Sequence, residues 1–344
     1  GDANETVLDG ASSLTMACRG GYIDAARCLL EHGARVNQAA NNGISALYSA
    51  CQHGHVDVAA LLLENNADVN ETYGGDFSPL CIACQDGHVA VVRLLLDNGG
   101  DFKHSTNDGE SPLYIACYHA HVEVALLLLE KGADINHVNN NGASPLCVAS
   151  QNNHIAVVQL LLEMGANVDQ ADKSGSSPLS LASYLNQVDV VSLLLEKGAD
   201  VNKAKDDGAS PLFLAAQNGH VRLVRLLLAK GADAAQVTNY EVSPLCAAAF
   251  QGHCDVARLL LENGQNGADV SQTNSKGTSP LFIACHYGHV DLVRLLLKKG
   301  ARVNQSDNKG RSPLYISYAV HHHLAIAPAI ARLLLDNGAD VDYA

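Results

Sequence analysis

The stretch from Ser111 to Gly132 reads SPLYIACYHAHVEVALLLLEKG, and it decides the fold because it contains two short helices with their boundaries. Ser111 is a good helix N-cap, and Pro112 suits the first helical position because its missing N–H would have no helical partner there. A second apolar run ends in a cluster of leucines, and Gly132 can adopt the left-handed conformation that closes a helix. The stretch therefore predicts a helix, a turn and a second helix.

The same pattern recurs along the whole chain. The leucine of its Ser-Pro-Leu motif returns every 33 residues, with one step of 36, at Leu14, Leu47, Leu80, Leu113, Leu146, Leu179, Leu212, Leu245, Leu281 and Leu314. Such a fixed period is the signature of a repeat array. We predict ten units with a short tail before them: residues 1–6 (tail of a preceding repeat), 7–39, 40–72, 73–105, 106–138, 139–171, 172–204, 205–237, 238–273, 274–306 and 307–344.

The linkers between the helices repeat as well. A Gly-His turn commonly joins the two helices of a unit, and a segment rich in Asn, Asp and Gly follows the second helix, as a protruding hairpin would require. The combined pattern G-A-D-V-N…G-x-S-P-L-x-x-A…G-H…V-V-x-L-L-L resembles the ankyrin repeat over the entire chain. The resemblance implies an all-α solenoid of stacked helix-turn-helix units with protruding hairpin loops. It also implies that partner contacts lie mainly on the concave side.

Two units depart from the period. Repeat 8 gains three residues at Gly264–Gly267, and repeat 10 gains five, which we expect to extend the loop between its helices near Ala319–Ala327. At the start, residues 1–6 align with Ala199–Ala204, the tail of a unit. We therefore expect the chain to be a piece of a longer array or of a larger multidomain protein.

The composition limits the classes of partner. A formal net charge of −14 opposes general attraction to nucleic acid or anionic lipid, and no apolar run is long enough to span a membrane. We expect a monomer in the cytoplasm or another intracellular compartment, with no nucleic-acid or membrane partner. Basic residues concentrate late in the chain: Arg222, Arg225, Arg258, Arg294, Lys298, Lys299 and Arg302. We expect them to form either a solvated face or a docking patch for an acidic partner.

Cysteine and histidine are frequent, but their spacing favours structural roles. Cys81 and Cys84 form a C-x-x-C motif without the second ligand pair that a zinc site needs, and Cys84 occupies a small position that other units fill with Cys, Ala or Ser. Reduced thiols suit an intracellular compartment. The turn histidines recur once per unit instead of clustering, and the His321–His323 tract would bind a metal ion only adventitiously. We predict no catalytic residue, no metal site and no cofactor, so the chain is not expected to be an enzyme.

Nearly all of the aromatic residues fall on the surface that should face a partner. We predict partner-binding side chains directly after the motif leucine, about one turn later on the same helix, and in the hairpins: Tyr48, Tyr114, Phe213, Phe282 and Tyr315; Tyr118, His119, Tyr184, Phe250, His286 and Tyr287; Phe77 and Tyr240. Tyr and Phe commonly anchor protein interfaces. The alternative is that these rings pack sideways between adjacent first helices and hairpins.

Two functions follow from the resemblance. The first is a non-catalytic scaffold that binds a protein or peptide partner along its concave face. The second is a regulatory or targeting array that belongs to a larger enzyme or channel.

Overall fold

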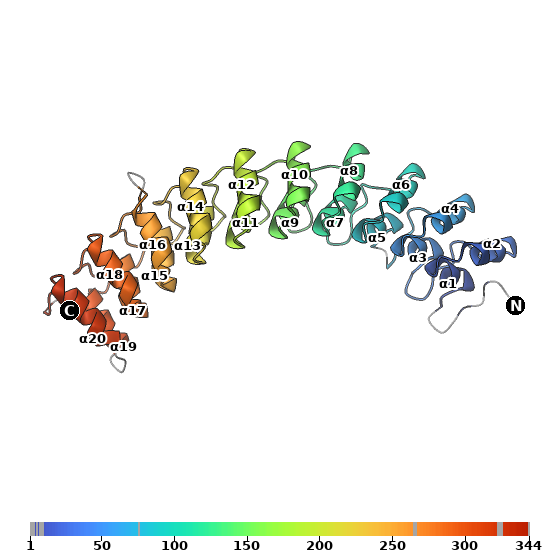
Figure 1. Cartoon of the computed structure of the whole chain (residues 1–344). Coiled ribbons are helices and arrows are strands. Elements are labelled where there is room, and N and C mark those ends of the chain that lie inside the picture. The colour runs from blue at the N-terminus through green and yellow to red at the C-terminus, as the bar shows by residue number, and fades with distance from the viewer. Residues whose placement is uncertain are drawn as a thin grey trace. The chain divides into compact units, whose positions relative to one another are not determined.

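The computed structural model describes residues 4, 6, 10–74, 76–263, 267–321 and 326–342. The chain divides into two compact units, Gly1–Lys173 and Ser174–Ala344, and each consists of helix pairs stacked side by side (Figure 1). The helices of unit 1 are α1 (Ser13–Arg19), α2 (Ile23–Glu31), α3 (Ala46–Gln52), α4 (Val56–Glu64), α5 (Pro79–Gln85), α6 (Val89–Asp97), α7 (Pro112–Tyr118), α8 (Val122–Glu130), α9 (Pro145–Gln151) and α10 (Ile155–Glu163).

Unit 2 continues the same succession of helix pairs. Its helices are α11 (Pro178–Tyr184), α12 (Val188–Glu196), α13 (Pro211–Gln217), α14 (Val221–Ala229), α15 (Pro244–Gln251), α16 (Cys254–Leu261), α17 (Pro280–Tyr287), α18 (Val290–Lys298), α19 (Pro313–His321) and α20 (Ile326–Asp336). In the described ranges the only pairings of extended backbone are two isolated bridges, Thr6 with Ser12 and Tyr73 with Phe77. The all-α expectation is therefore confirmed.

Each first helix begins as its sequence predicts. In α7 the Ser111 hydroxyl oxygen accepts a hydrogen bond from the Tyr114 N–H at 3.2 Å, and Pro112 stands at the first helical position. The cap satisfies a backbone donor that the helix itself cannot pair. Leu113 is then fully buried between the helices of its own and neighbouring repeats.

The second helices from α2 to α18 have no side-chain cap at their N-termini and depend on packing. Helix α8 buries Val124, Ala125, Leu127 and Leu128 on one face. An isolated helix of nine residues is unstable in water, so this apolar face, covered by the first helix and by adjacent second helices, holds α8 in place.

The turn histidines connect successive repeats. The Nε2–H of His88 donates to the backbone carbonyl of Gln52, one repeat earlier, at 3.1 Å. Since a carbonyl can only accept, the ring carries its proton on Nε2. The ring also packs on Gly54, where an added Cβ would lie 2.8 Å from it. The same contact to a carbonyl of the preceding repeat is made by His55, His121, His154, His220, His253 and His289.

Asparagines in the hairpin loops tie successive loops together. Asn37 accepts from the Asp68 N–H at 2.9 Å and donates to the Asn66 carbonyl at 3.2 Å. Asn4, one period earlier, makes the same two hydrogen bonds, with the N–H of Arg35 and with the carbonyl of Gly33. Where these bonds form, successive repeats contact each other through the turn or through the hairpin.

The longer tenth repeat differs from the expected extended loop at Ala319–Ala327. Helix α19 continues to His321 and α20 begins at Ile326, so they have nine and eleven residues, against seven and nine in α7 and α8. Part of the added length therefore extends the helices. Residues 322–325, with His322 and His323, lie outside the described residues, as do positions 264–266 of the insertion in repeat 8. No described helix is both long and apolar enough to cross a lipid bilayer.

Candidate partner-binding surface

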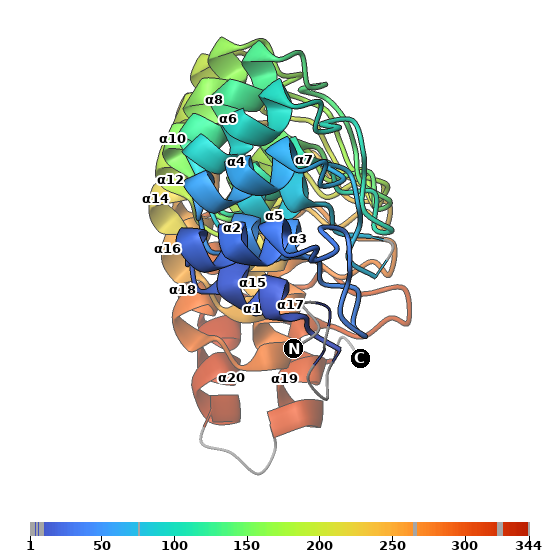
Figure 2. The same cartoon turned by 90° about the vertical axis from the view of Figure 1, so that its right-hand side faces the viewer.

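In each unit the hairpin loops project on the side of the first helices, and the second helices lie on the opposite side (Figure 2). We call the surface made by the odd-numbered helices and the hairpin loops the first-helix face. The aromatic residues predicted from the sequence all belong to these elements. Their exposure separates them into two groups.

Three of the aromatic residues directly after the motif leucine are buried. Tyr48 and Tyr114 each keep 6% of their surface exposed and Phe282 keeps 4%. Burial is the largest cause that raises the pKa of both tyrosines to about 12. These side chains offer little area to a partner.

The buried rings instead contact the hairpin of the next repeat. The rings of Tyr48 and Tyr73 lie 5.4 Å apart between centroids, and the Tyr114 hydroxyl accepts a hydrogen bond from the Asn139 amide at 3.2 Å. Residues 73 and 139 both stand 25 positions after the aromatic residue. The position therefore fills the space between a first helix and the following hairpin loop. Phe213 is half-buried there and Tyr315 is exposed.

The aromatic residues near the C-terminal ends of the first helices are open to solvent. Between 41% and 53% of the surface is exposed in Tyr118, Tyr184, Phe250 and Tyr287. The backbone carbonyls of Tyr118, Tyr184 and Phe250 each accept the hydrogen bond of a turn histidine from the next repeat. The repeat contacts thus fix the backbone of these residues while their rings remain free for contact.

Two small clusters form around these rings. In unit 2 the rings of Phe250 and Tyr287 lie 4.4 Å apart, and His286 packs edge-on against Tyr287 at 4.7 Å. In unit 1 the ring of His119, which is exposed, lies 5.0 Å from that of Tyr118. Partial burial, followed by repulsion from the neighbouring His121, lowers the pKa of His119 below its ordinary value.

A cavity of about 410 Å³ opens on the first-helix face of unit 2. It brings together three of the predicted residues, Tyr184 from α11, Phe213 from α13 and Tyr240 from the hairpin loop before α15. Tyr240 is 71% exposed. In unit 1 a second cavity, of about 450 Å³, is lined by Tyr48, Phe77 and the neighbouring Tyr73. Both cavities have the size of ligand and side-chain pockets.

Sequence reasoning missed several exposed apolar residues on or beside these elements, among them Met16, Leu185 and Tyr318. Leu185 could have been predicted from the repeat alignment, because it stands at the position that His119 and Tyr287 occupy in their own repeats. Tyr318 lies in the lengthened α19, where the 33-residue alignment no longer predicts which positions face outward.

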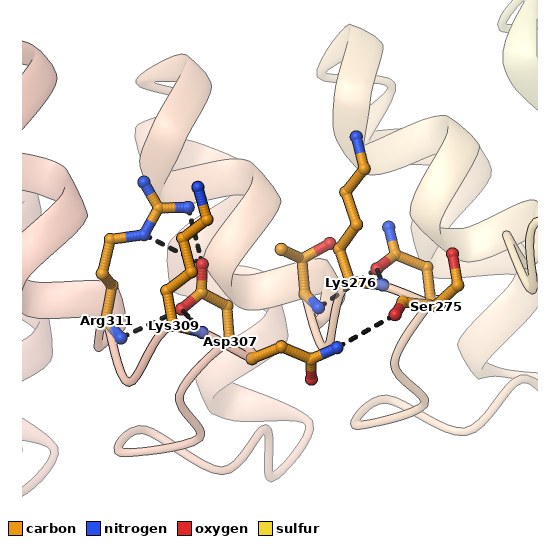
Figure 3. Close-up of polar contacts among 8 residues, drawn as sticks. Ser275, Lys276, Asp307, Lys309 and Arg311 are labelled. Atoms are coloured by element: carbon orange, nitrogen blue, oxygen red, sulfur yellow. Dashed lines mark hydrogen bonds and ion pairs between the residues drawn. The ribbon is translucent and has the colours of Figure 1, made fainter.

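The hairpin loops of unit 2 are held by polar contacts (Figure 3). The Asn308 amide donates to the Ser275 carbonyl at 3.0 Å, which links the last two loops. Within the last loop, the Asp307 carboxylate accepts from the guanidinium of Arg311 at 2.6 Å and from two backbone N–H groups. Burial works to raise the pKa of Asp307, but these hydrogen bonds outweigh it, so the pKa is lowered.

The histidine and cysteine residues provide no reactive site among the described residues. No group of three or more His, Cys, Asp or Glu side chains there could hold a metal ion. All ten cysteines lie in the described part of the chain, and none is in a disulfide. Burial raises the pKa of the Cys84 thiol well above its ordinary value, and it raises that of Cys81 as well. These thiols are therefore poor nucleophiles at neutral pH.

Comparison with known proteins agrees with this architecture. The family described as ankyrin repeats (3 copies) matches residues 1–73, 74–139, 134–205, 201–274 and 265–344. A search of curated proteins finds no significant match. Among solved structures, the human ASB11 ankyrin repeat domain is similar, with 33% sequence identity and a TM-score of 0.59 over 64% of this chain and 98% of that one. With the family matched along its whole length, the chain belongs to the ankyrin repeat proteins.

Proposed function

We propose that this chain is a non-catalytic scaffold that binds a protein or peptide partner along its first-helix face. Ankyrin repeats are in general protein interaction modules, and their fold is typically non-catalytic. The observation that carries the proposal is the exposure of Tyr118 on the first-helix face of unit 1 and of Tyr184, Phe250 and Tyr287 on the first-helix face of unit 2. A soluble protein that leaves aromatic rings open at regular positions has surface suited to a partner.

The mechanism is recognition by a preformed surface. Within each unit, turn histidines and hairpin asparagines link successive repeats, so binding need not order the backbone of those repeats first. A preorganised surface loses less conformational freedom on association and retains more of its contact energy as affinity. Aromatic rings add large contact area with few rotatable bonds.

The test replaces Tyr118, Tyr184, Phe250 and Tyr287 together with Ala. Tagged wild-type protein and the variant are used to capture partners from cell extract, and the captured proteins are quantified by mass spectrometry. We expect a set of proteins that the wild type retains and the variant loses. The thermal transition should change little because the four rings are half-exposed.

A matched control removes exposed apolar side chains from the opposite side of the array. Leu126 lies on α8, Met164 directly follows α10 and Leu335 lies on α20, and all three are exposed. Their triple Ala variant should retain the partners. If the four-ring variant and the control retain the same proteins, the first-helix face is not the binding surface.

A further inference from the structure

The cavity in unit 2 lies between two first helices and two hairpin loops. Helices α11 and α13 supply its aliphatic floor, Leu181 and Leu214, and the loop before α15 adds Val242. Three aromatic rings, from Tyr184, Phe213 and Tyr240, complete its walls.

One residue that lines the cavity is small in repeat 6. Ser180 stands directly after the motif leucine, where Tyr48, Tyr114 and Phe282 fill the equivalent space in other repeats. Ser180 is buried, and its hydroxyl donates to the Ser177 carbonyl at 2.8 Å. A serine does not reach the following hairpin as a tyrosine does, and Ser180 lines the cavity together with Phe213.

The charges at this cavity are unbalanced. Its lining includes Lys205 and Asp207, whose charged atoms are 4.0 Å apart, at the limit of an ion pair. The same two hairpin loops also carry Asp206 and Glu241, both exposed. The lining thus holds one ammonium and one carboxylate, and two further carboxylates stand on the same loops.

The loop that carries Tyr240 is unusual among the hairpins. Glu241 has a φ of +60°, at a position where the equivalent residues Gly208 and Gly277 have φ values of +83° and +74°. A left-handed conformation costs a residue with a Cβ roughly 1–2 kcal/mol. Such strain is often retained at functional sites. Here it presents an exposed ring and a carboxylate side by side at the cavity.

We propose that this cavity receives an arginine side chain from an extended segment of the partner protein. The aliphatic part of the arginine packs on Leu181, Leu214 and Val242, and its guanidinium stacks on the aromatic walls. A planar, weakly hydrated guanidinium suits such rings better than an ammonium does. Asp207 pairs with the guanidinium, and Glu241 adds negative potential at the mouth. This inference rests on the proposed function and names the chemistry that one part of the surface recognises.

The test uses short random peptides displayed on phage and selected on the wild-type protein. Selected peptides are synthesised with a fluorescent label, and their dissociation constants are measured by anisotropy against a set of variants. Ser180→Tyr places a ring in the cavity and should obstruct an occupant, and the fold already accommodates tyrosine at this position in Tyr48 and Tyr114. We expect peptides whose binding falls about tenfold or more in Ser180→Tyr, and we expect these peptides to contain an arginine.

Charge variants then identify the chemistry of the occupant. Replacing the peptide arginine by citrulline, which keeps the shape and removes the charge, should weaken binding about tenfold. Asp207→Asn should weaken binding, and Lys205→Ala should strengthen it roughly threefold because Lys205 competes for the carboxylate. Asp269→Asn is the control, because Asp269 likewise accepts a backbone N–H two residues on but does not line the cavity.

Each alternative outcome is distinct. Some selected peptides could depend on the cavity, which means that they lose affinity in Ser180→Tyr, and yet carry an apolar residue in place of arginine. If the affinity of such peptides is unchanged in Lys205→Ala, the arginine assignment is overturned. Cavity-dependent peptides that carry an acidic residue and weaken in Lys205→Ala would overturn it as well. Peptides that bind with equal affinity to Ser180→Tyr but lose affinity when Tyr118, Phe250 and Tyr287 become Ala would refute this inference and leave the proposed scaffold function intact. A selection without any cavity-dependent peptide also counts against the inference.

Discussion

The turn between the two helices of repeat 4 contains a strained alanine, and its replacement gives a sharp prediction. Ala120 has a φ of +65°, whereas the same turn position holds glycine in Gly54, Gly87 and Gly219, at +73°, +76° and +74°. Only glycine adopts this conformation without a steric penalty. Ala120→Gly should therefore stabilise the protein, and Gly87→Ala should destabilise it.

The magnitudes follow from two opposing terms. The left-handed conformation costs alanine roughly 1–2 kcal/mol, and glycine avoids this cost. Glycine in turn lowers the stability by about 0.4–1 kcal/mol, because it increases the conformational freedom of the unfolded chain. Ala120→Gly should thus raise the free energy of unfolding by about 0.5–1 kcal/mol. At Gly87 an added Cβ would also lie 2.5 Å from the ring of His121. With this crowding, Gly87→Ala should cost roughly 2 kcal/mol.

Urea denaturation followed by circular dichroism measures both changes, and hydrogen exchange localises them. Because coupling in a repeat array acts mainly between neighbours, the change in amide protection should be largest in α5 to α8 and weaker further along unit 1. An Ala120→Gly variant that unfolds at a lower urea concentration than the wild type would refute this reasoning. So would a Gly87→Ala variant of unchanged stability.

Three further predictions concern packing, the turn histidines and the last hairpin. Leu128→Ala, at a fully buried site in α8, should lower the free energy of unfolding by about 2–5 kcal/mol, measured by urea denaturation. His88→Ala leaves the Gln52 carbonyl without its donor and should cost about 1 kcal/mol, with faster hydrogen exchange at the junction of α3 and α5 as the check. The pKa of Asp307 is lowered in the folded state. The ionised carboxylate therefore stabilises the fold at pH values above its unfolded pKa, near 3.9. That contribution is lost as the pH falls through the lower pKa of the folded state. Arg311→Ala should cost about 1–2 kcal/mol at neutral pH and reduce the acid-dependent loss below pH ~4; an unchanged acid unfolding profile would contradict the assignment.

The repeat register and the helices could be predicted from the sequence because their causes are local. A serine cap, a proline at the first helical position and a glycine after the leucine cluster act within a few residues, and ten copies reinforce one another. The structural role of the turn histidines also followed from their recurrence, although their hydrogen-bond acceptor lies one repeat earlier, as in His88 and Gln52.

The tertiary structure alone decided which aromatic residues can meet a partner. Tyr114 and Tyr315 occupy the same position of the repeat, yet the first is buried and the second exposed, because burial depends on the hairpin of the next repeat. Likewise, Tyr184, Phe213 and Tyr240 come from two helices and a hairpin loop and surround one cavity in unit 2. A period in the sequence fixes the position of a residue within its own repeat, whereas exposure depends on the size of side chains in neighbouring repeats, which differ from one copy to the next.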